Sequence, residues 1–163
     1  MALNSVFLNP GEMVFSNQPL IVKTVLGSCV GICIYDKKNR VGGMTHYLLP
    51  KPFSGEASTK YGSVAIPYLI KKFEQNGSSI ANLEASILGG SFVLFDEKEI
   101  FFVGDKNIEI AQEYVRKYKL SIKMMNTGGE TGRSVVFNTQ TGEILVRMHQ
   151  ELTLQDLYRE PQK

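Results

Sequence analysis

The chain lacks most of the features that mark nucleic-acid-binding, membrane and disulfide-rich proteins. Its net charge is only +2 over 163 residues, and its lysines and arginines are scattered among acidic residues, so no basic stripe predicts nucleic-acid binding. No apolar run approaches the ~20 residues of a membrane-spanning helix, and the N-terminus lacks the charged start and apolar core of a secretion signal. Two cysteines, four residues apart, do not form a disulfide framework. We therefore expect a cytoplasmic protein with free thiols.

The residues that are present predict one globular domain over residues 1–163, with a polar tail from about residue 150 that frays. Many short β-prone runs and two helical patterns occur without regular βαβ alternation, which favours an α+β fold with a mostly antiparallel sheet and two main helices on one side. The expected strands are 12–16, 20–26, 83–88, 92–95, 122–125, 134–137 and 144–148, and the expected helices are 63–76 and one capped by Asp105 or Asn107.

The stretch Gly27-Ser28-Cys29 begins the pattern on which the functional interpretation depends. An apolar run after Cys29, a polar tetrad and a second β-prone run that contains His46 predict an antiparallel hairpin. If Tyr35 pairs with Arg40, Cys29 falls opposite His46, where opposed Cβ atoms lie about 5 Å apart. A thiol beside an imidazole is an arrangement for nucleophilic attack on a carbonyl carbon.

Cys29 by itself has two interpretations. Free cysteine is among the most buried residue types, so a small core side chain is the simpler one. Cys29 also follows Gly-Ser at the edge of an element, where free backbone N–H groups can bind an oxyanion. A neighbouring His46 would hold it as a thiolate below the usual pKa of ~8.5. The residues alone leave catalysis and structure at even odds, and His46 is equally open to a packing role.

The predicted register also assigns the two faces of the hairpin. Gly31 and Gly42 would leave room for a substrate side chain on the face of Cys29 and His46, and the opposite face should be core. That core face carries Val30, Ile32, Ile34 and Val41.

Two other patterns have a structural and a chemical interpretation. Cys33 shares a face with Cys29 but lies about 13 Å along the strand. A zinc site made of Cys29, Cys33, His46 and His149 would therefore require a helix here, and we interpret Cys33 as core. The glycine-rich loop 128–132 before Arg133 lacks the lysine-serine ending of a P-loop and a following helix, which favours a tight turn over a phosphate site.

Taken together, the motifs resemble the CheD family of chemoreceptor glutamine deamidases, over nearly the whole chain. The resemblance implies a bacterial cytoplasmic enzyme that converts receptor glutamines to glutamates without metal or organic cofactor. It also implies a fold akin to cytotoxic necrotizing factor toxins, a CheC- or CheX-type phosphatase partner, Cys29 as nucleophile and His46 as base. The matching motifs are Leu26 to Asp36, Gly42-Gly43-Met44 with His46 and Leu49-Pro50, Leu83-Glu84-Ala85 with Gly89-Gly90, Gly104 with Asn107-Ile108, and Gly128-Gly129 with Gly132-Arg133 and Thr141-Gly142-Glu143.

One position departs from the family pattern. The family's third catalytic residue is a threonine six residues before the cysteine, where this chain has Lys23. Thr24 is one residue closer, and in a regular strand it would point away from the face of Cys29. A bulge at Gly27 would restore the register, so Thr24 is the candidate third residue.

Three functions stay open at this point. In a deamidase, His46 takes the Cys29 proton, the sulfur attacks the glutamine carboxamide, ammonia leaves, and water cleaves the thioester. A receptor glutamyl methylesterase would use the same residues. A binding module that docks a receptor or a phosphatase would use neither residue chemically.

Overall fold

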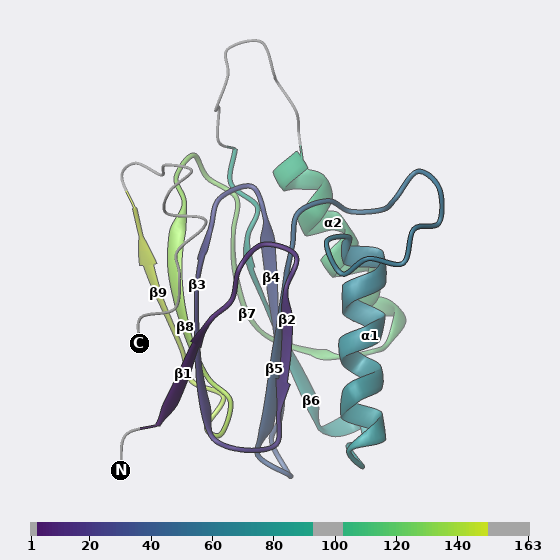
Figure 1. Ribbon diagram of the computed structural model, residues 1–163, viewed down its shortest axis with the longest axis vertical. Coiled ribbons are helices and arrows are strands. Elements are labelled where there is room, and N and C mark those ends of the chain that lie inside the picture. Colours follow the sequence, from purple (N-terminus) through teal and green to yellow (C-terminus); the bar gives the residue numbers. More distant parts are fainter. Residues whose placement is uncertain (1–2, 93–102, 150–163) are drawn as a thin grey trace.

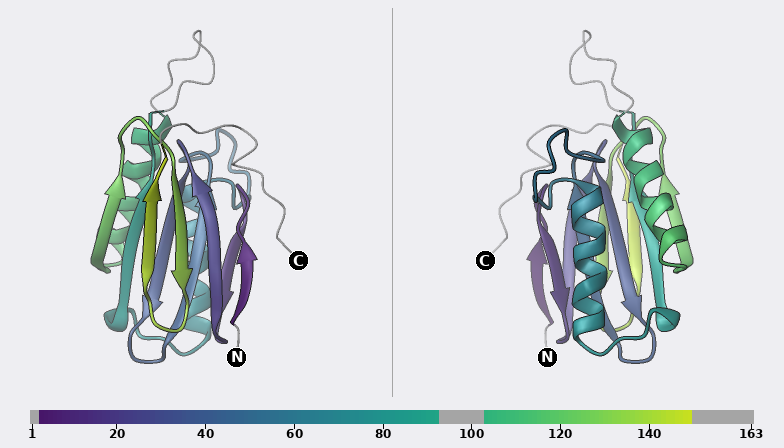
Figure 2. Two further views of the ribbon diagram at one scale, coloured as in Figure 1. Left: turned by 90° about the vertical axis from the view of Figure 1, so that its left-hand side faces the viewer. Right: turned by 90° about the vertical axis from the view of Figure 1, so that its right-hand side faces the viewer.

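The computed structural model describes residues 3–92 and 103–149 and arranges them in three layers (Figures 1 and 2). Two β-sheets stack face to face, and both helices cover the outer face of the second sheet. The four-stranded sheet has the order β1 (Asn4–Phe7), β3 (Leu20–Leu26), β8 (Arg133–Asn138), β9 (Ile144–Met148). The five-stranded sheet has the order β2 (Met13–Ser16), β5 (Val41–Tyr47), β4 (Val30–Asp36), β6 (Leu83–Gly89), β7 (Ser121–Thr127). The helices are α1 (Gly62–Gln75), α2 (Val103–Lys117) and the short 3₁₀ helix η1 (Ile80–Asn82).

The α+β prediction is confirmed, because β1–β3 and β6–β7 pair in parallel and the other strand pairs among the described residues are antiparallel. Strand β1 was not predicted, and most of the expected strand at 92–95 lies outside the described residues. Helix α2 begins at Val103, so neither Asp105 nor Asn107 caps it. Asn107 lies buried inside the helix instead.

Two hydrophobic cores fill the spaces between the three layers. One lies between the helices and the five-stranded sheet and contains the predicted core face of the hairpin, Val30, Ile32, Ile34 and Val41. The other lies between the two sheets. Every residue of β4 is buried because the strand is central in its sheet and is covered on both faces, which explains its nearly continuous apolar sequence. Full burial of each large aliphatic side chain contributes about 1.5–3 kcal/mol.

Helix α1 tolerates a proline in its second turn. Pro67 has no N–H to donate to the carbonyl of Ser63, four residues earlier. The hydroxyl of Tyr114, on α2, donates to that carbonyl at 3.3 Å. The contact between the helices therefore satisfies the acceptor that the proline leaves open.

The hairpin β4–β5 forms, but two residues out of the predicted register. Tyr35 lies opposite Gly42, and Gly31 rather than Cys29 lies opposite His46. Because the shift is an even number of residues, His46 keeps the predicted face of the sheet. Cys29 itself precedes β4, in the bend that carries the chain from one sheet to the other.

The shift originates at the turn. Asp36 remains in the ladder opposite Val41, so the four turn residues are Lys37–Arg40. The Asp36 carboxylate accepts the backbone N–H groups of Lys38 and Asn39 at 2.9 and 3.0 Å. These bonds hold the chain in an Asx-type turn, and the last turn residue takes a left-handed φ of 56°.

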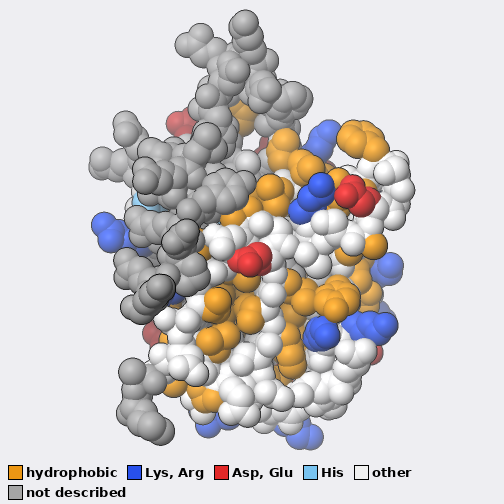
Figure 3. All heavy atoms as spheres, viewed as in Figure 1, with side chains coloured by type: hydrophobic (Ala, Val, Ile, Leu, Met, Phe, Trp, Pro, Cys, Tyr) orange, Lys and Arg blue, Asp and Glu red, His pale blue; other side chains and the backbone are white. Residues whose placement is uncertain are grey.

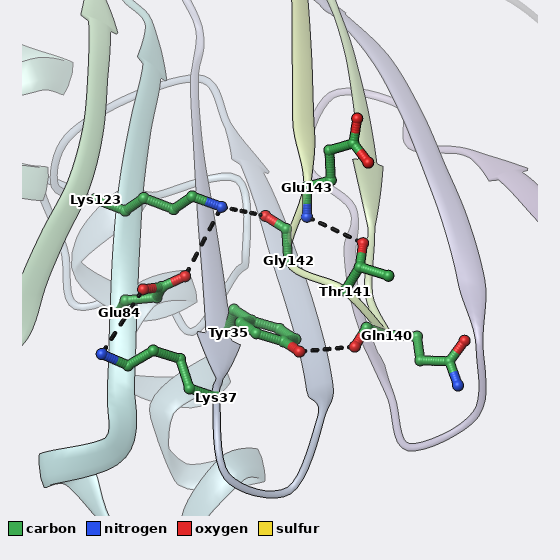
Figure 4. A network of polar contacts seen from close by, with 8 residues as sticks. All are labelled: Tyr35, Lys37, Glu84, Lys123, Gln140, Thr141, Gly142 and Glu143. Carbon is green, nitrogen blue, oxygen red and sulfur yellow. Dashed lines mark hydrogen bonds and ion pairs between the residues drawn. The ribbon is translucent and has the colours of Figure 1, made fainter.

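A polar network ties the two sheets together at the end of the sandwich that holds the β4–β5 and β8–β9 turns (Figures 1 and 4). Lys123 of β7 donates to the carbonyl of Gly142, and the hydroxyl of Tyr35 donates to that of Gln140, each at 2.7 Å. Glu84 lies between Lys123 and a second lysine at 3.8 and 3.9 Å. This network is far from Cys29, at the opposite end of β4 (Figure 1).

Charged side chains on the face drawn in Figure 3 are dispersed between apolar patches, without a stripe of lysine and arginine. In the described part of the chain, no helix is long and apolar enough to cross a membrane.

Candidate active site

His46 lies fully buried between the two sheets and is held through its Nδ1 atom. Thr24 Oγ1, on β3 of the facing sheet, lies 2.8 Å from Nδ1. The same hydroxyl donates to the carbonyl oxygen of Leu8 at 2.6 Å, and Nδ1 is 3.3 Å from that oxygen. Three segments from two sheets therefore converge on one nitrogen of the ring.

These contacts fix the tautomer of His46. The Leu8 carbonyl can only accept, and the Thr24 hydroxyl uses its proton on that carbonyl. Nδ1 must then carry the ring proton and donate it, which leaves the lone pair on Nε2. Nε2 is buried and has no hydrogen-bond partner among the described residues. An oriented imidazole with an unpaired basic nitrogen is what a general base requires.

Thr24 reaches His46 without the bulge that its sequence position suggested. The β3–β8 ladder runs from Ile21 to Leu26 without a shift. Thr24 points inward and is buried, whereas Lys23 points outward and is exposed. Side-chain alternation would turn Thr24 away from Cys29 only if both lay in one strand. The chain changes sheets at Gly27–Cys29, so Thr24 contacts His46 from the opposite layer.

The loop Gly27–Cys29 carries the predicted nucleophile, and this nucleophile loop is held from two sides. The N–H groups of Gly90 and Ser91 donate to the carbonyls of Cys29 and Gly27, both at 2.9 Å. Asn107 Nδ2 donates to the carbonyl of Ser28 at 3.0 Å. The loop's own N–H groups donate to no other backbone group in residues 3–92 and 103–149. The N–H groups of Gly27 and Ser28 are therefore available for the predicted oxyanion role, whereas that of Cys29 donates to its own sulfur.

The close approach behind Cys29 depends on a glycine. Gly89 has φ 98°, and a Cβ atom there would lie 2.4 Å from the carbonyl oxygen of Cys29. Any larger residue would push the nucleophile loop away.

The protonation states of the pair differ from the expected thiolate. Burial raises the pKa of the Cys29 thiol to about 12, and the hydrogen bond from its own N–H lowers it only in part. Burial lowers the pKa of His46 to about 4, against the opposing effect of the Leu8 carbonyl. The expectation that His46 holds Cys29 as a thiolate is therefore wrong for the unliganded protein, in which both groups are neutral at pH 7.

The two groups are also not joined by a hydrogen bond. No hydrogen bond joins the Cys29 sulfur to His46, whose Nε2 is unpaired, because Cys29 lies outside the ladder position opposite His46. Cys29 belongs to the core cluster between the sheets, which His46 also faces, and the residue is 7% exposed.

The expectation of open space beside the glycines is wrong. A Cβ atom at Gly31 would lie 2.6 Å from the Met44 methyl group, and one at Gly42 would lie 2.9 Å from the Cα of Thr139. Gly42 lets the two sheets pack closely, and the Met44 side chain of the same sheet fills the space beside Gly31. They leave no room for a substrate side chain.

Cys33 and the glycine-rich loop have structural roles. Cys33 is buried between the sheets in β4, and the segment is a strand rather than the helix that the zinc interpretation required. Arg133 is 1% exposed and donates to Asn126 and to the carbonyls of Gly128 and Thr131, which it gathers into a tight turn.

The sequence did not predict two groups that contribute to the site, the Leu8 carbonyl and the Asn107 side chain. The Leu8 carbonyl acts through the backbone, so no residue type marks it. Asn107 was recognised as a polar residue near a helix start, but its partners, the carbonyls of Ser28 and Leu48, are distant in sequence.

Comparison with known proteins places the chain in a family. Residues 48–148 match the family model described as "CheD chemotactic sensory transduction". A Rhodospirillum rubrum protein named "Probable chemoreceptor glutamine deamidase CheD" is 38% identical over 93% of this chain and 86% of its own. Its counterpart in Methanosarcina acetivorans, "Probable chemoreceptor glutamine deamidase CheD 1", is 36% identical over 87% of this chain and 91% of its own.

A third relative, "Probable chemoreceptor glutamine deamidase CheD 1" from Anaeromyxobacter dehalogenans, is 34% identical over 87% of this chain and 83% of its own. The family-model match begins just after His46. The alignment with the Rhodospirillum rubrum protein covers 93% of the chain and therefore extends over both Cys29 and His46. The extent and level of these similarities show that the chain belongs to the CheD family.

Proposed function

We propose that this protein is a cysteine-dependent amidohydrolase that deamidates glutamines of bacterial chemoreceptors to glutamates. The observation that carries the proposal is the buried imidazole of His46, whose tautomer is fixed by Thr24 and Leu8 and whose Nε2 is unpaired. The relatives, named as probable chemoreceptor glutamine deamidases, supply the substrate class.

The proposed roles follow from the protonation states. The Cys29 thiol keeps its proton in the resting protein, so proton transfer to His46 Nε2 accompanies attack of the sulfur on the carboxamide carbon. The N–H groups of the nucleophile loop stabilise the oxyanion. The imidazolium then returns the proton to the departing ammonia, and water, activated by His46, cleaves the thioester to glutamate and free thiol. Thr24 orients the ring.

The remaining assignments extend the same proposal. Because the core between the two sheets combines elements from both ends of the described chain, we infer one deamidase domain over residues 1–163. Family membership supports a cytoplasmic location, where receptor signalling helices lie, and a CheC- or CheX-type phosphatase as partner. The residues present need no cofactor for the reaction as written.

Mass spectrometry of purified receptor cytoplasmic fragments tests the proposal. Incubation with the protein should convert specific glutamines to glutamates with release of ammonia. Cys29→Ala should abolish both while keeping the far-UV circular dichroism spectrum. Methylated fragments in a parallel reaction test the esterase alternative through release of methanol.

Three results would contradict the proposal. Unchanged glutamines with tight receptor binding would favour a binding module. Methanol release from methylated fragments without any glutamine conversion would favour the esterase. Full activity of a folded Cys29→Ala protein would remove the nucleophile assignment.

A further inference from the structure

We propose that Asn107 is a positioning residue that clamps the nucleophile loop against the end of β5 that carries His46. The inference deepens the proposed function, on which its catalytic part rests. Asn107 is fully buried on α2, in a different layer from Thr24 and Leu8. Its role would be to set the separation between Cys29 and His46.

The contacts of Asn107 reach both segments at once. Its Nδ2 donates to the carbonyl of Ser28 at 3.0 Å and to that of Leu48 at 2.8 Å. Ser28 adjoins the nucleophile, and Leu48 lies two residues after His46. The hydroxyl of Tyr47, also beside His46, donates to the backbone carbonyl of Asn107 at 2.5 Å.

In the Asn107 side chain, the amide nitrogen has hydrogen-bond partners and the amide oxygen has none among the described residues. This asymmetry indicates that the two N–H donors explain why an asparagine occupies the position. Both partners of Nδ2 are carbonyl oxygens, so the amide cannot be flipped. Its Oδ1 is buried and has no hydrogen-bond partner in the described part of the chain. An unpaired buried amide oxygen costs stability, and asparagine is a weaker helix former than alanine or leucine. Fold stability alone therefore gives little reason for an asparagine in this position.

The other contacts of the loop predict what happens when the clamp is removed. Gly90 and Ser91 hold the carbonyls of Cys29 and Gly27 through backbone N–H groups, which a substitution at Asn107 leaves in place. Within the loop only the carbonyl of Ser28 loses its partner, and at the end of β5 the carbonyl of Leu48 loses the same donor. We therefore expect the loop to shift and open locally while the sheets stay intact.

Alkylation of the two cysteines measures that local opening. Cys29 lies in the clamped loop and Cys33 in the middle of β4, so Cys33 reports opening of the fold as a whole. Both thiols would be alkylated with iodoacetamide at pH 8 over a time course. Peptide mass spectrometry would then give the ratio of the alkylation rates of Cys29 and Cys33. The variants are Asn107→Ala, which removes the donors, and Asn107→Asp, which keeps the shape but faces the carbonyls with oxygen. Lys106→Ala, an exposed neighbour on the same helix, is the matched control.

We expect the Cys29/Cys33 ratio to rise by roughly tenfold in both Asn107 variants, since the two hydrogen bonds of Asn107, one to the loop and one to the end of β5, are lost together. Receptor glutamine deamidation should show kcat reduced on the order of 10²-fold with KM little changed, because displacement of a reacting group by about 1 Å costs that much. Lys106→Ala should leave the ratio and kcat unchanged. Faster alkylation of Cys29 relative to Cys33, together with slower catalysis, is a combination that loss of fold does not produce, because unfolding exposes both buried thiols.

Two outcomes would overturn the proposal. An unchanged ratio would show that Asn107 does not hold the loop. Equal acceleration of both cysteines in both variants would make Asn107 a residue of the fold alone. If the wild-type protein deamidates no receptor glutamine, the proposed function fails, but the alkylation ratio still decides whether Asn107 clamps the loop.

Discussion

The burial of His46 predicts that the protein loses stability as the pH falls from 7 to 4. In the unfolded chain a histidine titrates with a pKa of about 6.5, whereas burial lowers the pKa of His46 in the folded protein to about 4. Between these values the unfolded chain binds a proton that the folded protein does not. The contribution of His46 to stability is therefore fully present above pH 6.5 and is lost as the pH falls towards 4.

The size of the effect follows from the same two pKa values. A tenfold difference in proton affinity corresponds to ~1.4 kcal/mol, so the loss should reach about 3 kcal/mol in the free energy of unfolding at pH 4. With a urea m-value of about 2 kcal/mol/M for a domain of this size, the midpoint should fall by roughly 1.5 M. The chain has no tryptophan, so far-UV circular dichroism is the suitable signal.

Two variants isolate His46 from other acid-sensitive groups. Between pH 7 and pH 4, the free energy of unfolding of His46→Gln should fall by about 3 kcal/mol less than that of the wild type. His149→Gln, which removes the only other histidine, should retain it. The pKa of Asp36 is also lowered in the folded protein, through hydrogen bonds from Ser78, Asn39 and Lys38 that exceed the effect of burial, but this carboxylate is common to all three proteins. Equal acid sensitivity of wild type and His46→Gln would refute the burial argument.

Two further substitutions test the site and its surroundings. Thr24→Val should lower kcat about tenfold in the deamidation assay, because Nδ1 of His46 then keeps only the longer contact to the Leu8 carbonyl. Thr24→Ser, which keeps the hydroxyl, should restore the rate. A Thr24→Val enzyme as fast as wild type would make Thr24 structural. Cys33→Ala should keep most of the activity, and its free energy of unfolding in urea should be lower by about 1 kcal/mol, since it truncates a buried core side chain. Inactivity as complete as that of Cys29→Ala would reopen the choice of nucleophile.

Local sequence determined most of the elements and the face of His46. Alternating and continuous apolar runs identified β3, β4, β5 and β9 within a residue at most, because burial on one or both faces imposes those patterns. Side-chain alternation has a period of two, so an even register shift left His46 on the predicted face. The shift itself depended on the Asp36 carboxylate, whose hydrogen bonds moved the turn by one residue.

The tertiary structure alone decided how the candidate catalytic residues meet. Thr24 and His46 belong to different sheets, and no periodicity within a strand predicts a contact across a sandwich. The Leu8 carbonyl fixes the tautomer through a backbone atom that every residue type shares. The pKa values of Cys29 and His46 moved in the directions that burial dictates, because burial between two sheets is a property of the assembled layers. The sequence therefore determined which residues are candidates for the chemistry, and the stacking of the sheets determined their protonation and orientation.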